Sequence, residues 1–97
     1  MYVVILKATV DNLDQEYKDV LEKMKILAFE QYGCLEFTAM MDGNNRIALS
    51  YWENEEQIKK WKQNIEHLKT QNQAQNKWYK TYSVQVAEIT REYSFNT

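Results

Sequence analysis

The hydrophobic residues of this chain repeat with two different periods, and the order of those periods leaves few topologies open. A β-branched run at 2–10 and an alternating run at 35–41 have the period of two that is typical of strands. Apolar residues from Leu13 to Ala28 recur every three or four positions, as on one side of an amphipathic helix. Gly33 follows this helix, and glycine readily adopts the left-handed conformation that ends helices.

The second half of the chain repeats the same kinds of segment. Asp-Gly-Asn-Asn at 42–45 predicts a hairpin turn into a third strand over residues 47–51. Asn54 is placed to cap a second helix, with Gln57 as its capping-box partner three residues later. The apolar stripe of that helix consists of Ile58, Trp61, Ile65 and Leu68.

A polar segment at 71–77 predicts a turn before a long fourth strand over residues 78–91. Its alternation shifts phase at 87–89, which indicates either a bulge or burial on both faces. The complete order is β-α-β-β-α-β, which predicts an α+β ferredoxin-like fold with a four-stranded antiparallel sheet. A length of 97 residues suits a single domain spanning 1–97.

Charge and cysteine content exclude several classes of function. The formal net charge of −2 gives no electrostatic reason to bind nucleic acid or an anionic membrane. One cysteine, Cys34, excludes an internal disulfide and a cysteine-based metal cage, and its sequence neighbours predict an unreactive thiol. The apolar N-terminal segment is too short to span a bilayer and does not resemble a leader, so we expect a cytoplasmic protein.

The same topology occurs in RNA recognition modules, which need a strand of basic and aromatic residues with glycine. Neither RIALSYW nor YSVQVAEI has that composition. RNA binding is therefore not expected.

The strands are apolar on both faces, although two helices can cover only one face of a sheet. In the first strand Val3 and Ile5 point one way, whereas Val4 and Leu6 point the other. A monomer would leave an apolar face in water, which soluble monomers rarely do. The pattern predicts a homodimer in which sheet packs on sheet. The alternative is a monomer whose strands are simply rich in apolar residues.

At this point the chain resembles the antibiotic biosynthesis monooxygenase family along nearly its whole length. The resemblance rests most on Ser50-Tyr51-Trp52, Trp61, His67, Gln71, Trp78-Tyr79, Tyr82 and the closing run Arg91-Glu92-Tyr93-Ser94-Phe95. It implies a dimeric α+β barrel, with a ligand cavity between the helices and the sheet of each subunit and Trp61 in its wall. It also implies oxidation of phenolic substrates without a bound cofactor, which is one activity of this family.

The haem-degrading members of that family combine an asparagine on the first strand, a tryptophan on the second helix and a histidine ten residues later. Trp61 matches the tryptophan, but Gln71 stands ten residues on and Lys7 stands at the first-strand position. His67 follows Trp61 by six residues instead of ten, which places it about 40° around the helix from the position ten residues on. Haem degradation is therefore disfavoured.

His67 is the candidate general base, because imidazole titrates near neutral pH. It shares a polar strip with Asn64 and Gln71, which are candidate substrate-binding residues; the alternative is a histidine at the surface. A lone histidine among amides is not a metal site. Arg91 is a candidate for holding an anionic substrate or its oxyanion, and an ion pair with a neighbouring glutamate is the alternative.

Aromatic residues supply the other candidates. Trp61 and Trp78 are candidates for a platform that stacks on a planar substrate, or else core residues that anchor helix to sheet. Tyr51 and Tyr82 are candidates for offering phenolic hydroxyls to the ligand, or else residues that pack their rings.

Two functions remain open on the sequence alone. One is a cofactor-independent monooxygenase that acts on a small phenolic or quinol substrate, with no metal. The other is a non-enzymatic small-ligand-binding protein, such as a stress-response protein, which needs the pocket but not the base.

Overall fold

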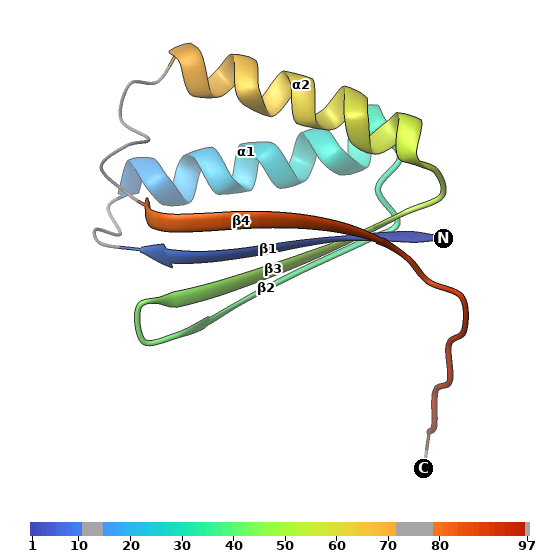
Figure 1. Cartoon of the computed structure of the whole chain (residues 1–97). Coiled ribbons are helices and arrows are strands. Elements are labelled where there is room, and N and C mark those ends of the chain that lie inside the picture. The colour runs from blue at the N-terminus through green and yellow to red at the C-terminus, as the bar shows by residue number, and fades with distance from the viewer. Residues whose placement is uncertain (11–14, 72–78, 97) are drawn as a thin grey trace.

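The computed structural model describes residues 1–10, 15–71 and 79–96, and the side chains in these ranges except those of residues 16, 65–71 and 79. The elements follow the expected order (Figure 1): β1 (Tyr2–Val10), α1 (Gln15–Tyr32), β2 (Glu36–Asp42), β3 (Asn45–Trp52), α2 (Glu55–Gln71) and β4 (Tyr79–Glu88). The strands pair antiparallel in the order β2-β3-β1-β4, and both helices lie on one side of the sheet. The predicted ferredoxin-like α+β fold is confirmed.

Short-range signals form the junctions between these elements. The side-chain oxygen of Asn54 accepts the backbone N–H of Gln57 at 2.9 Å, so the predicted cap of α2 is present. Gly33 has φ +80° directly after α1 and ends that helix as predicted. The β2–β3 hairpin turns through two residues, of which Gly43 has φ +60°, as a type II′ turn requires at its first position.

The core lies between the helices and the sheet. Its main cluster consists of Val4, Ala28, Cys34, Trp52, Ile58 and Trp61, and a second, smaller cluster contains Val10 and Tyr17. Trp52 is fully buried, and its indole N–H donates to the hydroxyl of Ser50 at 2.9 Å. A buried indole donor thus has a partner on the same strand and the same face.

Strand register divides the sheet into two faces, which we name the helix face and the open face. The helix face contains Tyr2, Val4, Leu6 and Ala8 of β1 opposite Trp52, Ser50, Ala48 and Arg46 of β3. The open face contains Val3, Ile5, Lys7 and Thr9 of β1 opposite Tyr51, Leu49, Ile47 and Asn45 of β3. In β3, therefore, the bulky alternating residues expected from the sequence lie on the face that neither helix covers.

The fourth strand ends earlier than expected. The sequence pattern predicts a strand that reaches Arg91, but β4 stops at Glu88, and its pairing with β1 is regular from Glu88 back to Thr81. Of the two alternatives for residues 87–89, the bulge is therefore not observed at Ala87 or Glu88, and the register shift of this pair lies between Thr9 and Val10. Apolar residues 84 and 86 face one side of the sheet and Ala87 the other, which explains the mixed pattern.

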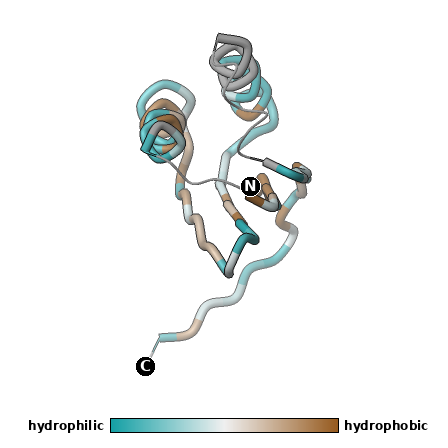
Figure 2. The backbone as a smooth tube through the Cα atoms, turned by 90° about the vertical axis from the view of Figure 1, so that its left-hand side faces the viewer, coloured by the Kyte–Doolittle hydropathy of each residue, from teal (hydrophilic) through white to brown (hydrophobic). Residues whose placement is uncertain are grey.

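Residues 89–96 leave the sheet on the side opposite the helices (Figures 1 and 2). We call them the C-terminal arm.

Neither described helix combines the length and the apolar character that a membrane crossing needs.

Candidate functional site

An apolar shelf lies on the helix face of β4. Tyr82, Val84 and Val86 pair with Ala8, Leu6 and Val4, so all three share the face that carries the helices. Nevertheless they are 49%, 42% and 46% exposed. We call these three residues the β4 shelf. Because apolar side chains on a covered face are normally buried, this exposure marks a surface suited to an apolar ligand.

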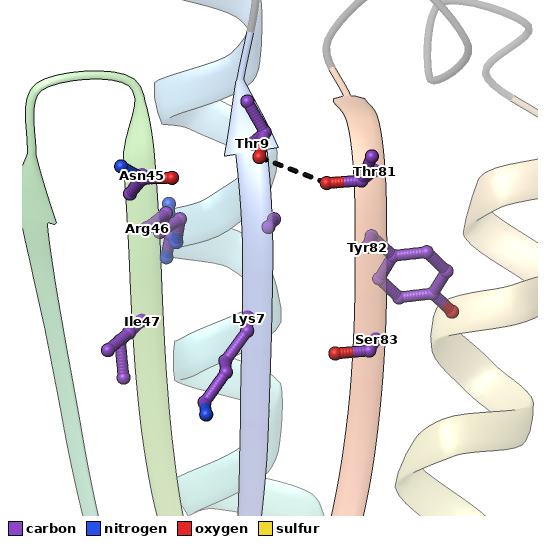
Figure 3. Close-up of a pocket in the computed structure, with 9 residues that line it drawn as sticks. Lys7, Thr9, Asn45, Arg46, Ile47, Thr81, Tyr82 and Ser83 are labelled. Atoms are coloured by element: carbon purple, nitrogen blue, oxygen red, sulfur yellow. Dashed lines mark hydrogen bonds between the residues drawn. The ribbon is translucent and has the colours of Figure 1, made fainter.

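The only oxygen-bearing side chain of the β4 shelf is the phenol of Tyr82. In the close-up, its ring points away from the side chains of Lys7 and Ser83 and toward the side on which α2 lies (Figure 3). The shelf therefore offers aliphatic area and one hydroxyl, which suits an aromatic ring that bears oxygen.

Trp61 is packed into the core. Its ring lies 5.0 Å from that of Trp52 and 6.3 Å, edge to face, from that of Phe37. The indole N–H of Trp61 donates to the carbonyl of Met24 at 3.3 Å, which ties α2 to α1. These contacts give Trp61 the anchoring role that the sequence left as its alternative.

Asn64 lies one helical turn after Trp61 and is half-buried. Its side-chain amide donates to the hydroxyl of Tyr32 at 3.0 Å. This bond links the two helices, and Tyr32 itself packs against the main core cluster. Asn64 therefore adds a polar group beside the core, with one of its donors already used.

Tyr51 and Lys7 lie on the open face, on the far side of the sheet from Trp61. The structure thus does not bring Tyr51 together with Trp61 or Tyr82. It also corrects the first-strand position considered for haem chemistry, since Lys7 points away from the helices. The neighbouring helix-face residues, Leu6 and Ala8, are not asparagine either.

The remaining candidates occupy three settings. His67 and Gln71 belong to α2, but their side chains lie outside the described residues, as does the whole of Trp78. Arg91 is exposed on the C-terminal arm, beyond the end of β4. Because the arm leaves the sheet away from the helices (Figure 1), Arg91 is not brought to the β4 shelf of its own chain.

A hollow of about 350 Å³ lies on the open face near the hairpin end of the sheet (Figure 3). Its side chains come from three neighbouring strands: Lys7, Thr9, Asn45, Ile47, Thr81 and Ser83. The hydroxyl of Thr81 donates to that of Thr9 at 2.9 Å across the β1–β4 pair. Sequence reasoning missed this hollow, because it depends on which residues the register places side by side.

A buried hydrogen bond between a cation and a phenol joins β3 to α1. A terminal nitrogen of the Arg46 guanidinium donates to the hydroxyl of Tyr17 at 2.7 Å, and the guanidinium carbon lies 5.5 Å from the centre of the Tyr17 ring. Both residues are buried, and within the described part of the chain the Nε of Arg46 has no acceptor. The alternation of β3 could have indicated in the sequence that Arg46 lies on the helix face, because Arg46 shares its phase with Ser50 and Trp52.

Comparisons with known proteins place this geometry in context. The chain is 30% identical over 95 residues to YqjZ, an uncharacterised protein of Bacillus subtilis (strain 168), and the match covers 97% of this chain and 83% of YqjZ. No known protein-family profile matches the chain.

Solved structures match the fold at low sequence identity. SnoaB, a cofactor-independent oxygenase from Streptomyces nogalater, superposes with a TM-score of 0.75 at 13% identity, over 94% of each chain. A proposed antibiotic biosynthesis monooxygenase from Bacillus cereus superposes with a TM-score of 0.60 at 18% identity, over 97% of each chain. At these identities the likeness establishes a shared fold.

Proposed function

Since this chain belongs to the same family as YqjZ of Bacillus subtilis and has the fold of the antibiotic biosynthesis monooxygenases, we propose that it is a cofactor-independent monooxygenase for a small phenolic or quinol substrate. The β4 shelf carries this proposal. It is an exposed aliphatic surface with one phenol, on the face of the sheet that the helices cover elsewhere. A planar aromatic ligand would bury the shelf and meet the hydroxyl of Tyr82.

The chemistry needs little from the protein. A deprotonated phenol can give an electron to dioxygen directly, so the site must exclude water, hold the ring and take up one proton. Oxidation of a ring methylene to a carbonyl then balances without a reductant. One oxygen atom of O₂ enters the product, and the other leaves as water with the two methylene hydrogens.

Residue roles follow from where the side chains lie. Tyr82 is our candidate for the group that hydrogen-bonds the substrate oxygen, because Arg91 of the same chain lies beyond the sheet. His67 remains the proposed base, on the strength of its chemistry and its place in α2. Haem degradation stays disfavoured, since the first-strand residues on the helix face, Leu6 and Ala8, are not asparagine and Gln71 stands where that reaction uses histidine.

A non-enzymatic binding protein is the second candidate. It is favoured by the composition of the β4 shelf, which supplies a surface and a hydroxyl but no acid or base among its three residues. Such a protein would bind the same aromatic ligands and release them unchanged.

We also propose that the protein is a homodimer that packs open face against open face. The arrangement of β3 supports this. Its bulky apolar residues Ile47, Leu49 and Tyr51 lie on the open face, whereas polar Arg46 and Ser50 are buried on the helix face. A stable interface needs about 800 Å² from each partner, and a second sheet would cover the apolar residues of the first.

Oxygen uptake with a panel of hydroquinones and anthrones tests the activity, while quenching of tryptophan fluorescence measures binding of the same compounds. Under the oxygenase proposal His67→Ala lowers turnover by about a hundredfold or more and leaves binding nearly unchanged. Binding of these compounds without oxygen uptake would identify a non-enzymatic binding protein instead. If the compounds neither bind nor are turned over, the proposed site is refuted.

Matched variants on β4 locate the site. Val84→Thr makes the β4 shelf polar without changing its shape, and Tyr82→Phe removes its hydroxyl; we expect each to weaken binding about three- to tenfold. Ser83→Ala lies between them on the opposite face and serves as the control. Equal effects of Val84→Thr and Ser83→Ala would show that the ligand does not bind on the helix face.

A further inference from the structure

The polar side chains of the open face gather at one corner of the sheet. The rows across β3, β1 and β4 that lie far from the hairpin are Tyr51–Val3–Ala87 and Leu49–Ile5–Gln85. The rows toward the hairpin are Ile47–Lys7–Ser83 and Asn45–Thr9–Thr81. Because β4 is an edge strand and Thr9–Asn45 is the last pair of β1 with β3, the polar rows form a corner. A second sheet centred on the apolar rows would leave this corner at the rim of the interface.

This corner contains the hollow of about 350 Å³ (Figure 3), and hydrogen-bond donors line it. Lys7 offers its ammonium and Asn45 its amide. The hydroxyls of Thr9 and Thr81 bond to each other at 2.9 Å, and that bond uses only one of their two hydrogens. Among the described residues no acidic side chain lines the hollow, since Asp42, which pairs with Asn45 across β2–β3, lies outside it. The hollow is therefore complementary to negative charge.

Lys7 lies on a central strand, where a charge on a largely apolar face needs a reason. Its strand, β1, pairs with β3 on one side and with β4 on the other. Lys7 is therefore not one of the edge lysines that keep a sheet from pairing with other chains. In the close-up its side chain leans from β1 toward β3, on the side of Ile47 (Figure 3). A cation within a hollow, beside an apolar side chain, suits an anionic ligand that also has an apolar part.

A second positive charge lies behind the hollow. Arg46 lines it from β3, while its guanidinium is buried on the helix face. Within the ranges that the structure describes, the guanidinium donates to the phenol of Tyr17 rather than to a carboxylate, and its Nε has no acceptor. Because salt screens a buried charge less than an exposed one, Arg46 adds to the positive potential at the hollow.

We propose that this hollow binds a small organic oxyanion, whose carboxylate or phosphate group is held by Lys7, Thr9 and Asn45. Charge-assisted hydrogen bonds of this kind are shorter and stronger than neutral ones. The volume of about 350 Å³ lies within the range of small-molecule pockets, and Ile47 supplies an apolar wall for the rest of the ligand. The site lies on the opposite face of the sheet from the β4 shelf, so it does not depend on the proposed oxygenase activity.

Titration of the full-length, isotope-labelled protein tests the site without any substitution. The probes are butyrate and inorganic phosphate, with chloride keeping the ionic strength constant. We expect saturable changes in the amide signals of Lys7, Thr9, Asn45 and Thr81. Saturation by butyrate alone identifies a carboxylate ligand, whereas saturation by phosphate extends the site to phosphate compounds. Changes that do not saturate with either probe, or that chloride alone reproduces, overturn the proposal.

Matched variants then assign the binding to this corner. Lys7→Met removes the charge and keeps the length of the side chain, and we expect it to raise the dissociation constant at least about tenfold. Thr9→Val keeps the shape and removes one hydroxyl, which should cost about three- to tenfold. The control Lys60→Met removes an exposed charge from α2 and should leave the constant within about twofold. Equal effects of Lys7→Met and Lys60→Met would show non-specific attraction only and would overturn the site.

Discussion

Cys34 shows how the surroundings of one residue set its chemistry. The thiol is buried next to Trp52 and Ile58, and it donates a hydrogen bond to the carbonyl of Glu36 at 3.2 Å. Burial raises the pKa of Cys34 above its ordinary value, and backbone hydrogen bonds at Glu36 and Tyr51 oppose this only in part. The neutral thiol is thus the form that the fold favours, as expected of a structural cysteine.

Alkaline pH should therefore destabilise the fold through this thiol. The folded state holds the proton at pH values where the unfolded chain has lost it, so this contribution is complete below the unfolded pKa and is lost as the pH rises through the folded pKa. Urea unfolding at pH 8 and pH 10 measures it. We expect wild type to lose more stability over this interval than Cys34→Ala does, by at most about 1.4 kcal/mol per pH unit. If the unfolding free energies of wild type and Cys34→Ala change in parallel with pH, the Cys34 thiol does not make this contribution.

At the scale of elements, two glycines perform different tasks at the ends of α1 and β2. Gly33 has φ +80°, and a Cβ at this position would lie 2.7 Å from the side-chain nitrogen of Gln57 in α2. Gly43 has φ +60° in the hairpin, and a Cβ there would meet nothing within 4 Å. Backbone conformation requires glycine at both positions, but only the end of α1 is also closed by a neighbouring element.

Alanine substitution separates the two requirements. Gly43→Ala should cost about 1 kcal/mol of unfolding free energy from left-handed backbone strain alone. Gly33→Ala should cost about 2 kcal/mol, because the half-buried Gln57 must also move. Thermal or urea unfolding of both variants gives the comparison. If Gly43→Ala costs as much as Gly33→Ala, the contact between the end of α1 and the first turns of α2 does not constrain the fold.

The whole molecule has an open side. The helices and the main core cluster lie on one face of the sheet, while Met40, Ile47 and the C-terminal arm are exposed on the other side. A chain of this size has a modest core, so burial of the second face in the proposed homodimer would contribute a large share of its stability.

An obligate dimer makes thermal stability depend on protein concentration. We expect the midpoint of unfolding to rise by about 5 °C or more for a hundredfold increase in concentration, because unfolding then includes dissociation. Leu49→Arg places a charge on the open face and should remove this dependence. Lys60→Glu, an exposed substitution on α2, is the control that should keep it. A wild-type midpoint that is independent of concentration would mean that the folded monomer is stable alone.

Short-range physics explains what the sequence predicted well. The bounds of β1, the end of α1 at Gly33, the two-residue hairpin and the Asn54 cap each depend on residues a few positions apart. Helix and strand periods then gave the element order, and the order gave the fold.

Long-range pairing decided the rest, and it is where sequence reasoning failed. Because the strands are apolar on both faces, alternation alone did not show that Trp52 faces the helices while Tyr51 faces away. The bond between Arg46 and Tyr17 joins residues 29 positions apart, and the packing of Trp61 on Trp52 requires α2 to lie over the sheet. By itself the sequence determined which segments form and in what order. Only the register between distant strands decided which side chains share a face, and with them the place of the β4 shelf.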